Sequence, residues 1–274
     1  MSISRLLSSI LASVLILVVM AQGALAAASR WESTDGGRLR LIVEDPQPSR
    51  DVLRAALQID LEPGWKTYWR EPGSAGIPPS ITFSGDMVRD ATLHFPAPVW
   101  VDDPYGSWAG YTDPVVLPVS LEINPDRGSG IVEADVFLGI CRDVCIPVSA
   151  TLELAVGTAR SSALHGAIVS TAYSALPHAG NERLSVESGR LLVNGELEIV
   201  ISHPDGGAGD VSLFVAAGPD RPYAKPRAVS RTDASTTFHV RPARAMKDGG
   251  AFDITVTARL GGDAVETVLS IAAP

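Results

Sequence analysis

Residues 132–156 read VEADVFLGICRDVCIPVSATLELAV, which is two runs of alternating residues on either side of a pair of cysteines. Every second residue is apolar over residues 132–140, and residues 148–156 repeat this pattern. A period of two is typical of a β-strand that buries one face. The stretch therefore predicts two neighbouring strands, the first ending at Cys141 and the second beginning at Cys145.

The three residues between the cysteines, Arg142-Asp143-Val144, would then form the tip of a hairpin with the two sulfurs facing across it. That geometry can bring the Cα atoms within the roughly 4.4–6.8 Å that a disulfide accepts. A helix would also bring residues four apart together, but the flanking alternation favours the hairpin.

The chain has only two cysteines, so the pair is either a structural bridge or a redox centre. Closing a ring of about five residues stabilises a fold by only roughly 2 kcal/mol, which makes the pair a poor structural bridge. Close spacing suits thiol–disulfide exchange, because the second sulfur must resolve the mixed disulfide formed by the first. Arg142 would favour a thiolate and Asp143 would oppose it, so the residues do not identify the nucleophile. An inert hairpin disulfide stays open as the alternative.

Further alternating runs occupy residues 53–61 and 115–123, and clusters of Gly and Pro separate the runs. Short strands separated by such turn-forming clusters predict an antiparallel β-sandwich. Over residues 161–174 the apolar residues recur at helical spacing, between a pair of serines and Pro177, which predicts a helix.

Alternation resumes from about residue 183, with hairpin turns predicted at Asn194-Gly195 and Gly261-Gly262. We therefore expect an all-β chain in which one helix links two β-sandwiches. The predicted boundaries are residues 29–157 for the first sandwich, 158–182 for the helical linker and 183–274 for a second, smaller sandwich.

The N-terminus has the features of an export signal. A basic start that includes Arg5 precedes an apolar run over residues 10–21 and the small-x-small pattern Ala24-Leu25-Ala26. The apolar run is too short to span a bilayer as a helix, although an uncleaved anchor stays an alternative. We expect residues 1–26 to be a cleaved signal peptide and the mature chain to have no membrane span.

The chain is acidic, with 22 basic and 31 acidic residues and a formal net charge of −9. Loss of Arg5 with the signal peptide would make this charge −10. Nucleic acids and anionic lipids require a basic face, so we expect neither as a partner. The five histidines are scattered without metal-ligand spacing, and we expect no metal site and no cofactor.

Three separated motifs occur in the first half of the chain. They are EPGWKTYWREPG followed by GIPP over residues 62–79, FPAPVWVDDPYG with YTD and LPV over residues 95–119, and the cysteine pair. In this order they resemble the N-terminal periplasmic domain of the thiol:disulfide interchange protein DsbD, and more closely that of ScsB-type proteins. The resemblance covers about residues 38–156, and three residues separate the cysteines as in the ScsB-type branch, where DsbD has five.

The resemblance implies an immunoglobulin-like sandwich in which a cap loop shields the redox pair. Carried over by position, the redox pair is Cys141 and Cys145, and the cap loop is Asp102, Asp103, Pro104 and Tyr105. The two acids would lie near enough to tune the thiol pKa values. Because Pro104 stands where the family has a shielding phenylalanine, we expect aromatic shielding from other residues, with Tyr68, Trp69, Tyr105 and Trp108 as the candidates.

In that family the domain receives electrons from a membrane-embedded domain and passes them to thioredoxin-like clients. The resemblance therefore implies a periplasmic thiol–disulfide oxidoreductase of the electron-relay type. This sequence contains neither the membrane carrier nor a thioredoxin-like domain, so a relay would need a separate CcdA-like or DsbD-like membrane donor. The alternative is a non-enzymatic module that binds copper(I) or a docking partner, with a structural disulfide. ScsB-type proteins are linked to copper tolerance, and soft thiolates suit that ion.

Overall fold

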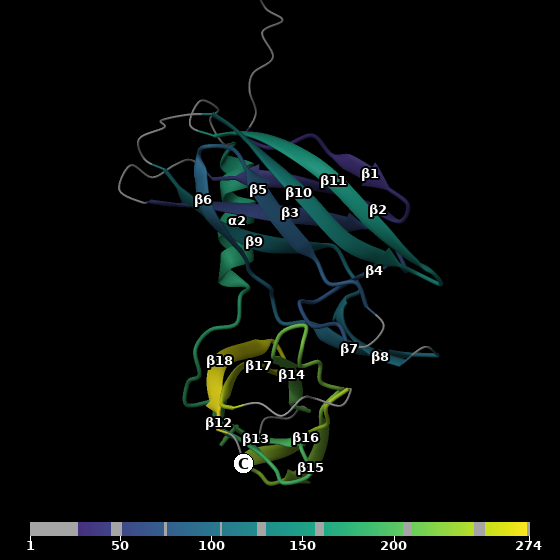
Figure 1. Ribbon diagram of the computed structural model, residues 1–274, viewed down its shortest axis with the longest axis vertical. Coiled ribbons are helices and arrows are strands. Elements are labelled where there is room, and N and C mark those ends of the chain that lie inside the picture. The colour runs from purple at the N-terminus through teal and green to yellow at the C-terminus, as the bar shows by residue number, and fades with distance from the viewer. Residues whose placement is uncertain are drawn as a thin grey trace, which may run out of the picture.

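The computed structural model describes residues 27–44, 51–73, 76–104, 106–124, 130–156, 162–204, 210–243 and 250–272. Across these ranges the chain is built from antiparallel strands and a single helix, which confirms the all-β prediction. Figure 1 shows a larger body above a smaller one, with the helix α2 beside the strands of the larger body and a loop leading from its end to the smaller one. No helix in the described ranges is long and apolar enough to cross a membrane.

The first body is an immunoglobulin-like sandwich of two sheets. One sheet has the order β1-β2-β3-β9-β6, formed by Glu32–Thr34, Gly37–Val43, Val52–Leu61, Val115–Ile123 and Val88–Leu93. The other has the order β11-β10-β4-β8-β7, formed by Cys145–Val156, Gly130–Cys141, Lys66–Tyr68, Gly106–Tyr111 and Val99–Asp103, and β5 (Ser80–Ser84) pairs with β10. Alternate apolar residues such as Leu57, Leu117 and Leu138 face inward and are fully buried between the sheets.

The helix α2 spans Ala163–Ser174 and confirms the helix predicted over residues 161–174. Ser162 caps its N-terminus, because the serine side chain accepts a hydrogen bond from the backbone N–H of His165 at 3.1 Å. Val169 is fully buried against Ile42 of β2 and Ala56 of β3. The helix therefore does more than link two domains, since it covers the outer face of one sheet of the first sandwich.

The second body is a smaller sandwich with its own core. Its sheets have the orders β12-β13-β16-β15 and β14-β17-β18. The strands are Ser185–Leu191, Leu197–Ser202, Ser235–Val240 and Arg227–Arg231 in the first sheet, and Ser212–Ala216, Phe252–Leu260 and Asp263–Ile271 in the second. Gly195 and Gly261 adopt positive φ angles in the β12–β13 and β17–β18 hairpins, which confirms the two predicted turns.

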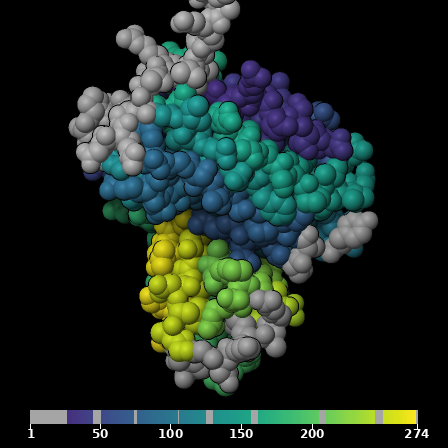
Figure 2. Space-filling view, turned by 45° about the horizontal axis from the view of Figure 1, so that its top comes forward, coloured from purple at the N-terminus to yellow at the C-terminus, as the bar shows by residue number. Residues whose placement is uncertain are grey.

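The two sandwiches share a contact that the sequence did not reveal. Phe214 of β14 is fully buried, and it belongs to the core of the first sandwich although the second sandwich supplies it. Its ring stacks on Trp100 with centroids 5.3 Å apart, and it meets Trp69 edge-on at 5.8 Å. Figure 2 shows the two bodies packed directly against each other. The domain boundaries that we expected from the sequence stay a prediction.

Candidate redox site

The two cysteines lie at the closed end of the β10–β11 hairpin. Residues 130–141 pair with residues 145–156 without a break, and the last pair in this register is Cys141 with Cys145. The two residues form a disulfide with their Cα atoms 4.1 Å apart. This geometry confirms the predicted hairpin and excludes the helical alternative.

The two cysteines differ in burial. Cys141 is only 1% exposed, whereas Cys145 is half-buried at the start of β11. The turn beside them is open to solvent, and Val144 at its tip is 73% exposed. A partner protein therefore meets the exposed turn and Cys145 before it meets Cys141.

Tyr68 contacts both sulfurs. Its hydroxyl oxygen lies 3.0 Å from Cys145 Sγ and 3.2 Å from Cys141 Sγ. Sulfurs in a disulfide carry no hydrogen, so the tyrosine O–H is the donor. Burial raises the pKa of this hydroxyl, and the charge of Asp103 raises it further. The hydroxyl therefore keeps its proton at neutral pH and is a fixed donor beside the disulfide.

The position of Tyr68 follows from the pairing of β4, a strand of three residues. β4 pairs on one side with β10, where Lys66 lies opposite Cys141, and on the other side with β8, where Tyr68 lies opposite Gly110. The ring of Trp108 on β8 meets the Tyr68 ring edge-on at 5.6 Å. Tyr68, Trp108 and Cys141 form one buried cluster, so aromatic rings cover the buried side of the disulfide.

Asp103 lies next to this cluster at the end of β7. Its Oδ2 atom accepts hydrogen bonds from Lys66 Nζ at 2.8 Å and from Trp108 Nε1 at 2.9 Å. The Lys66 ammonium also lies 4.4 Å from the centre of the Trp108 ring. The negative charge of Asp103 is thus balanced by a lysine near the sulfurs.

Asp102 faces away from the cysteines. Its carboxylate accepts two hydrogen bonds from Lys225 Nζ, at 2.7 and 2.9 Å, and Lys225 belongs to the second sandwich. Hydrogen bonds from Lys225 and Ser107 lower the pKa of the Asp102 carboxyl below its usual value. The two adjacent acids that we expected to act together therefore lie in different surroundings.

A hollow of about 380 Å³ separates the cysteine turn from the end of the β7–β8 hairpin. It is lined on one side by Arg142, Asp143, Val144 and Cys145, and on the other by Lys66, Tyr68, Asp103, Gly106, Ser107 and Trp108. The hollow gives a partner side chain or sulfur a place to lie directly beside Cys145.

The remaining residues predicted from the sequence lie elsewhere or outside the described ranges. Trp69 directly follows β4, and its side chain packs in the core of the first sandwich against Phe214. Pro104 is exposed at the turn of the β7–β8 hairpin. Tyr105 lies outside the described residues. Lys66 was missed as a site residue, although its position two residues before Tyr68 places both on one face of a strand.

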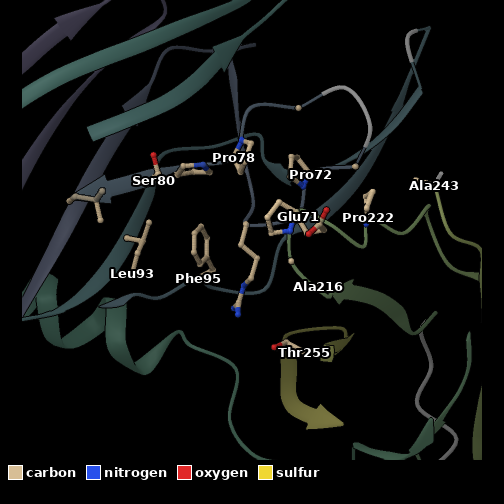
Figure 3. Close-up of a pocket in the computed structure, with 17 residues that line it drawn as sticks. Glu71, Pro72, Pro78, Ser80, Leu93, Phe95, Ala216, Pro222, Ala243 and Thr255 are labelled. Atoms are coloured by element: carbon tan, nitrogen blue, oxygen red, sulfur yellow. The ribbon is translucent and has the colours of Figure 1, made fainter. Parts of the chain in front are cut away.

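A larger hollow of about 880 Å³ lies between the two sandwiches, where no site was expected. Figure 3 shows Leu93 and Phe95 on the side of the first sandwich, and Ala216 and Thr255 on the side of the second. Glu71 lies in this hollow, and burial raises the pKa of its carboxyl from 4.5 to about 7. Within the described ranges no three His, Cys, Asp or Glu side chains gather in a way that could hold a metal ion.

Comparison with known proteins finds a family model and solved structures that are similar to this chain. Residues 40–157 match the family model described as the N-terminal part of the thiol:disulfide interchange protein DsbD. The crystal structure of the N-terminal periplasmic domain of ScsB from Proteus mirabilis is similar with a TM-score of 0.76 and 22% identity, over 91% of this chain and 100% of that chain. At this identity the likeness shows the shared fold. No curated protein sequence matches this chain.

Two further solved structures match more weakly. The C-terminal domain of BspA from Streptococcus agalactiae has a TM-score of 0.22 and 10% identity, over 89% of this chain and 99% of that chain. The C-terminal domain of AspA from Streptococcus pyogenes has a TM-score of 0.23 and 9% identity, over 90% and 99%. Neither likeness is close enough to carry an argument about fold or function.

Proposed function

We propose that this protein relays reducing equivalents in the periplasm, because residues 40–157 match the family model of the DsbD N-terminal part and the fold is similar to that of the ScsB N-terminal domain. The electrons would come from a CcdA-like or DsbD-like membrane protein and pass to thioredoxin-like clients. The observation that carries the proposal is the Tyr68 hydroxyl, which contacts both sulfurs of a disulfide beside an open hollow. A purely structural bridge has no need of such a donor.

In the reducing half-reaction, a thiolate of the donor attacks Cys145 Sγ, which is the more accessible sulfur. The S–S bond breaks, Cys141 leaves as a thiolate, and the donor and Cys145 form a mixed disulfide. The Tyr68 O–H stabilises the leaving thiolate, because hydrogen bonds to charged groups are stronger than those to neutral ones. A second donor thiolate then attacks the donor sulfur of the mixed disulfide and releases Cys145, so the donor is oxidised and the pair is reduced by two electrons.

In the oxidising half-reaction, the Cys145 thiolate attacks a client disulfide, and one client sulfur leaves as a thiolate. Cys141 then attacks Cys145 Sγ, which restores the internal disulfide and releases the client as a dithiol. Cys141 is suited to this resolving role because it is buried beneath Tyr68 and Trp108, where a second protein cannot reach it. The exposed turn beside Cys145 supplies the surface on which a thioredoxin-like client would dock.

Asp103 and Lys66 would tune the pKa of the thiols. The carboxylate raises the cost of a nearby thiolate, and the ammonium that binds it offsets this cost. We retain Asp102, Pro104 and Tyr105 as proposed cap residues, with Asp102 acting through its contact with the second sandwich. A cleaved signal peptide over residues 1–26 would deliver the chain to the periplasm, and N-terminal sequencing of exported protein would then begin at Ala27.

The first test is the equilibrium potential of the Cys141–Cys145 couple in a glutathione redox series, read by thiol alkylation and mass. We expect a value between roughly −180 and −270 mV, the range of exchange catalysts. A value below about −300 mV is typical of structural bridges and would overturn the proposal. It would favour the alternative of a docking or copper(I)-binding module.

Trapping variants give a second test of the assigned roles. Cys141→Ala leaves the accessible sulfur without its resolving partner, so mixed disulfides with thioredoxin-like proteins should accumulate. Cys145→Ala is the matched control, because it retains only the buried thiol and should trap little. Equal trapping by the two variants would contradict the assignment of Cys145 as the nucleophile.

A further inference from the structure

The β7–β8 hairpin, which borders the redox hollow, is held by the second sandwich. β7 is the edge strand of its sheet, and β8 is its only strand partner in the described ranges. The outer side of β7 contacts the second sandwich at two points. Trp100 stacks on Phe214 and donates a hydrogen bond from Nε1 to the carbonyl oxygen of Leu213 at 2.8 Å, and Asp102 binds Lys225.

The alternation of side chains along β7 gives this strand two different faces. Trp100 and Asp102 point toward the second sandwich. Val101 packs in the cluster that contains Tyr68 and Cys141, and Asp103 borders the hollow beside Cys145. Successive residues of a strand point to opposite faces, so one strand of five residues touches both the second sandwich and the redox site. A shift of β7 away from the second sandwich must therefore also disturb the side chains of Tyr68 and Trp108 that cover the disulfide.

We propose that Lys225 and Phe214 are positioning residues for the redox site, because they hold the β7–β8 hairpin against the disulfide and limit access to Cys145. This inference rests on the proposed exchange function and deepens it, since it gives the second sandwich a role in that function. Figure 1 shows the hairpin at the junction of the two bodies, where such a role is possible. Release of the hairpin widens the hollow on the side from which a partner sulfur must approach.

The two contacts have different physical characters. Phe214 is fully buried between Trp69 and Trp100, so it holds the hairpin at any ionic strength. The Lys225 and Asp102 side chains are 35% and 67% exposed, and salt weakens such a pair. Access to Cys145 should therefore depend on salt through Lys225.

The test is the rate at which dithiothreitol reduces the disulfide in the whole protein, because this small dithiol needs no docking surface. We expect Lys225→Ala to raise the rate about two- to fivefold at low salt, the factor that corresponds to an exposed ion pair. The difference from the wild type should vanish at about 0.5 M salt. Lys225→Arg keeps the charge and should keep the slow rate.

Three further variants separate this effect from general loosening of the fold. Arg190→Ala removes an exposed ion pair with Glu198 on the opposite sheet of the second sandwich, and it should leave the rate unchanged. The charge exchange of Asp102→Lys with Lys225→Asp should restore slow reduction, whereas Asp102→Lys alone should raise the rate.

The outcomes distinguish this inference from the function on which it rests. An unchanged rate for Lys225→Ala at low salt, together with a potential in the exchange-catalyst range, would overturn the inference and leave the proposed function intact. A potential below about −300 mV would overturn the proposed function, whatever the rates are. A faster rate that Lys225→Arg does not reverse would also count against the inference, because charge would then not be the cause.

Discussion

Tyr68 is the residue that most directly links the fold to the proposed chemistry, because its hydroxyl contacts both sulfurs. Tyr68→Phe removes this donor and keeps the ring that packs on Trp108. Loss of a hydrogen bond to a thiolate should raise the pKa of the reactive thiol by about one unit. The pH dependence of iodoacetamide alkylation of the reduced protein measures this shift.

Tyr111→Phe is the matched control for this prediction. Tyr111 lies on the neighbouring strand β8, and its hydroxyl donates a hydrogen bond to the carbonyl oxygen of Pro96, away from the cysteines. Its removal should leave the thiol pKa unchanged. If the two variants gave the same thiol pKa, the Tyr68 hydroxyl would have no role in stabilising the thiolate.

Glu71 leads to a second prediction at the residue scale, which concerns the pH dependence of stability. Burial raises the pKa of its carboxyl from 4.5 to about 7. Between these pH values the folded protein holds a proton that the unfolded chain has released, so the free energy of unfolding falls as pH rises. Glu71→Gln removes this dependence. It should therefore stabilise the protein by about 1 kcal/mol at about pH 8, after allowance for solvent screening of a half-exposed group, and by little near pH 4.

Urea unfolding at several pH values measures the effect of Glu71→Gln. The exposed Glu62 provides the control for removal of a surface carboxylate, and Glu62→Gln should change the free energy of unfolding by no more than about 0.5 kcal/mol. A stabilisation by Glu71→Gln that is independent of pH would show that the charge of Glu71 is not what costs stability.

At the scale of elements, the sequence predicts those strands and turns that depend only on residues close together in the chain. The β10–β11 hairpin could be predicted because both strands are long and a turn of three residues joins them, so alternation alone sets the register. β4 has three residues, and its pairing with β10 and β8 depends on residues far away in the chain. The contact between Tyr68 and the sulfurs depends on that pairing, so the sequence could not assign it.

Alternation could have narrowed two of the sequence predictions further. Tyr68 and Trp69 are adjacent, so only one of them can face the cysteines if both lie on a strand. The same holds for Asp102 and Asp103, of which only Asp103 borders the hollow beside Cys145. Which member of each pair faces the site depends on the register with the next strand, and neither motif reveals this register.

The close approach of β8 to β4 supports a prediction at this scale. Gly110 lies opposite Tyr68, and a Cβ atom at this position would overlap the carbonyl oxygen of Thr67. Gly110→Ala should therefore push β8 and its hairpin away from β4, at a cost of about 1–3 kcal/mol. Thermal unfolding and faster hydrogen exchange in β8 would report the change.

Gly166→Ala is the control for Gly110→Ala. Gly166 lies in α2, and a Cβ atom there would meet nothing within 4 Å. Alanine favours a helix by roughly 0.5–1 kcal/mol over glycine, so this variant should stabilise the protein slightly. An equally mild effect of Gly110→Ala would mean that the two strands can separate without loss of packing.

At the scale of the whole molecule, the two sandwiches are not independent bodies joined by a linker. Alternation predicted two sandwiches because each has its own inward-facing residues, but it carries no information on how their surfaces meet. Phe214 lies in a run that reads as an ordinary strand of the second sandwich, yet it is buried in the core of the first. Arg70 of the first sandwich also binds Glu266 of β18 with two hydrogen bonds, at 2.9 and 3.2 Å.

This shared core predicts that a change in the second sandwich destabilises the first. Phe214→Ala should cost the first sandwich about 3–5 kcal/mol, because it leaves a cavity beside Trp69 and Trp100. All five tryptophans precede residue 109, so tryptophan fluorescence reports unfolding of the first sandwich. The fluorescence transition of Phe214→Ala should therefore move to a lower urea concentration.

Phe238→Ala is the matched control, because Phe238 is buried in the separate core of the second sandwich. Its loss should lower the stability seen by circular dichroism with a smaller shift of the tryptophan transition. If Phe214→Ala left the tryptophan transition in place, the first sandwich would fold without the second, and Phe214 would be a surface contact only. A shift larger than that of Phe238→Ala would mean that the first sandwich relies on its neighbour for part of its core, and that residues 27–174 expressed alone, which keep the first sandwich and α2, should be less stable than the whole chain.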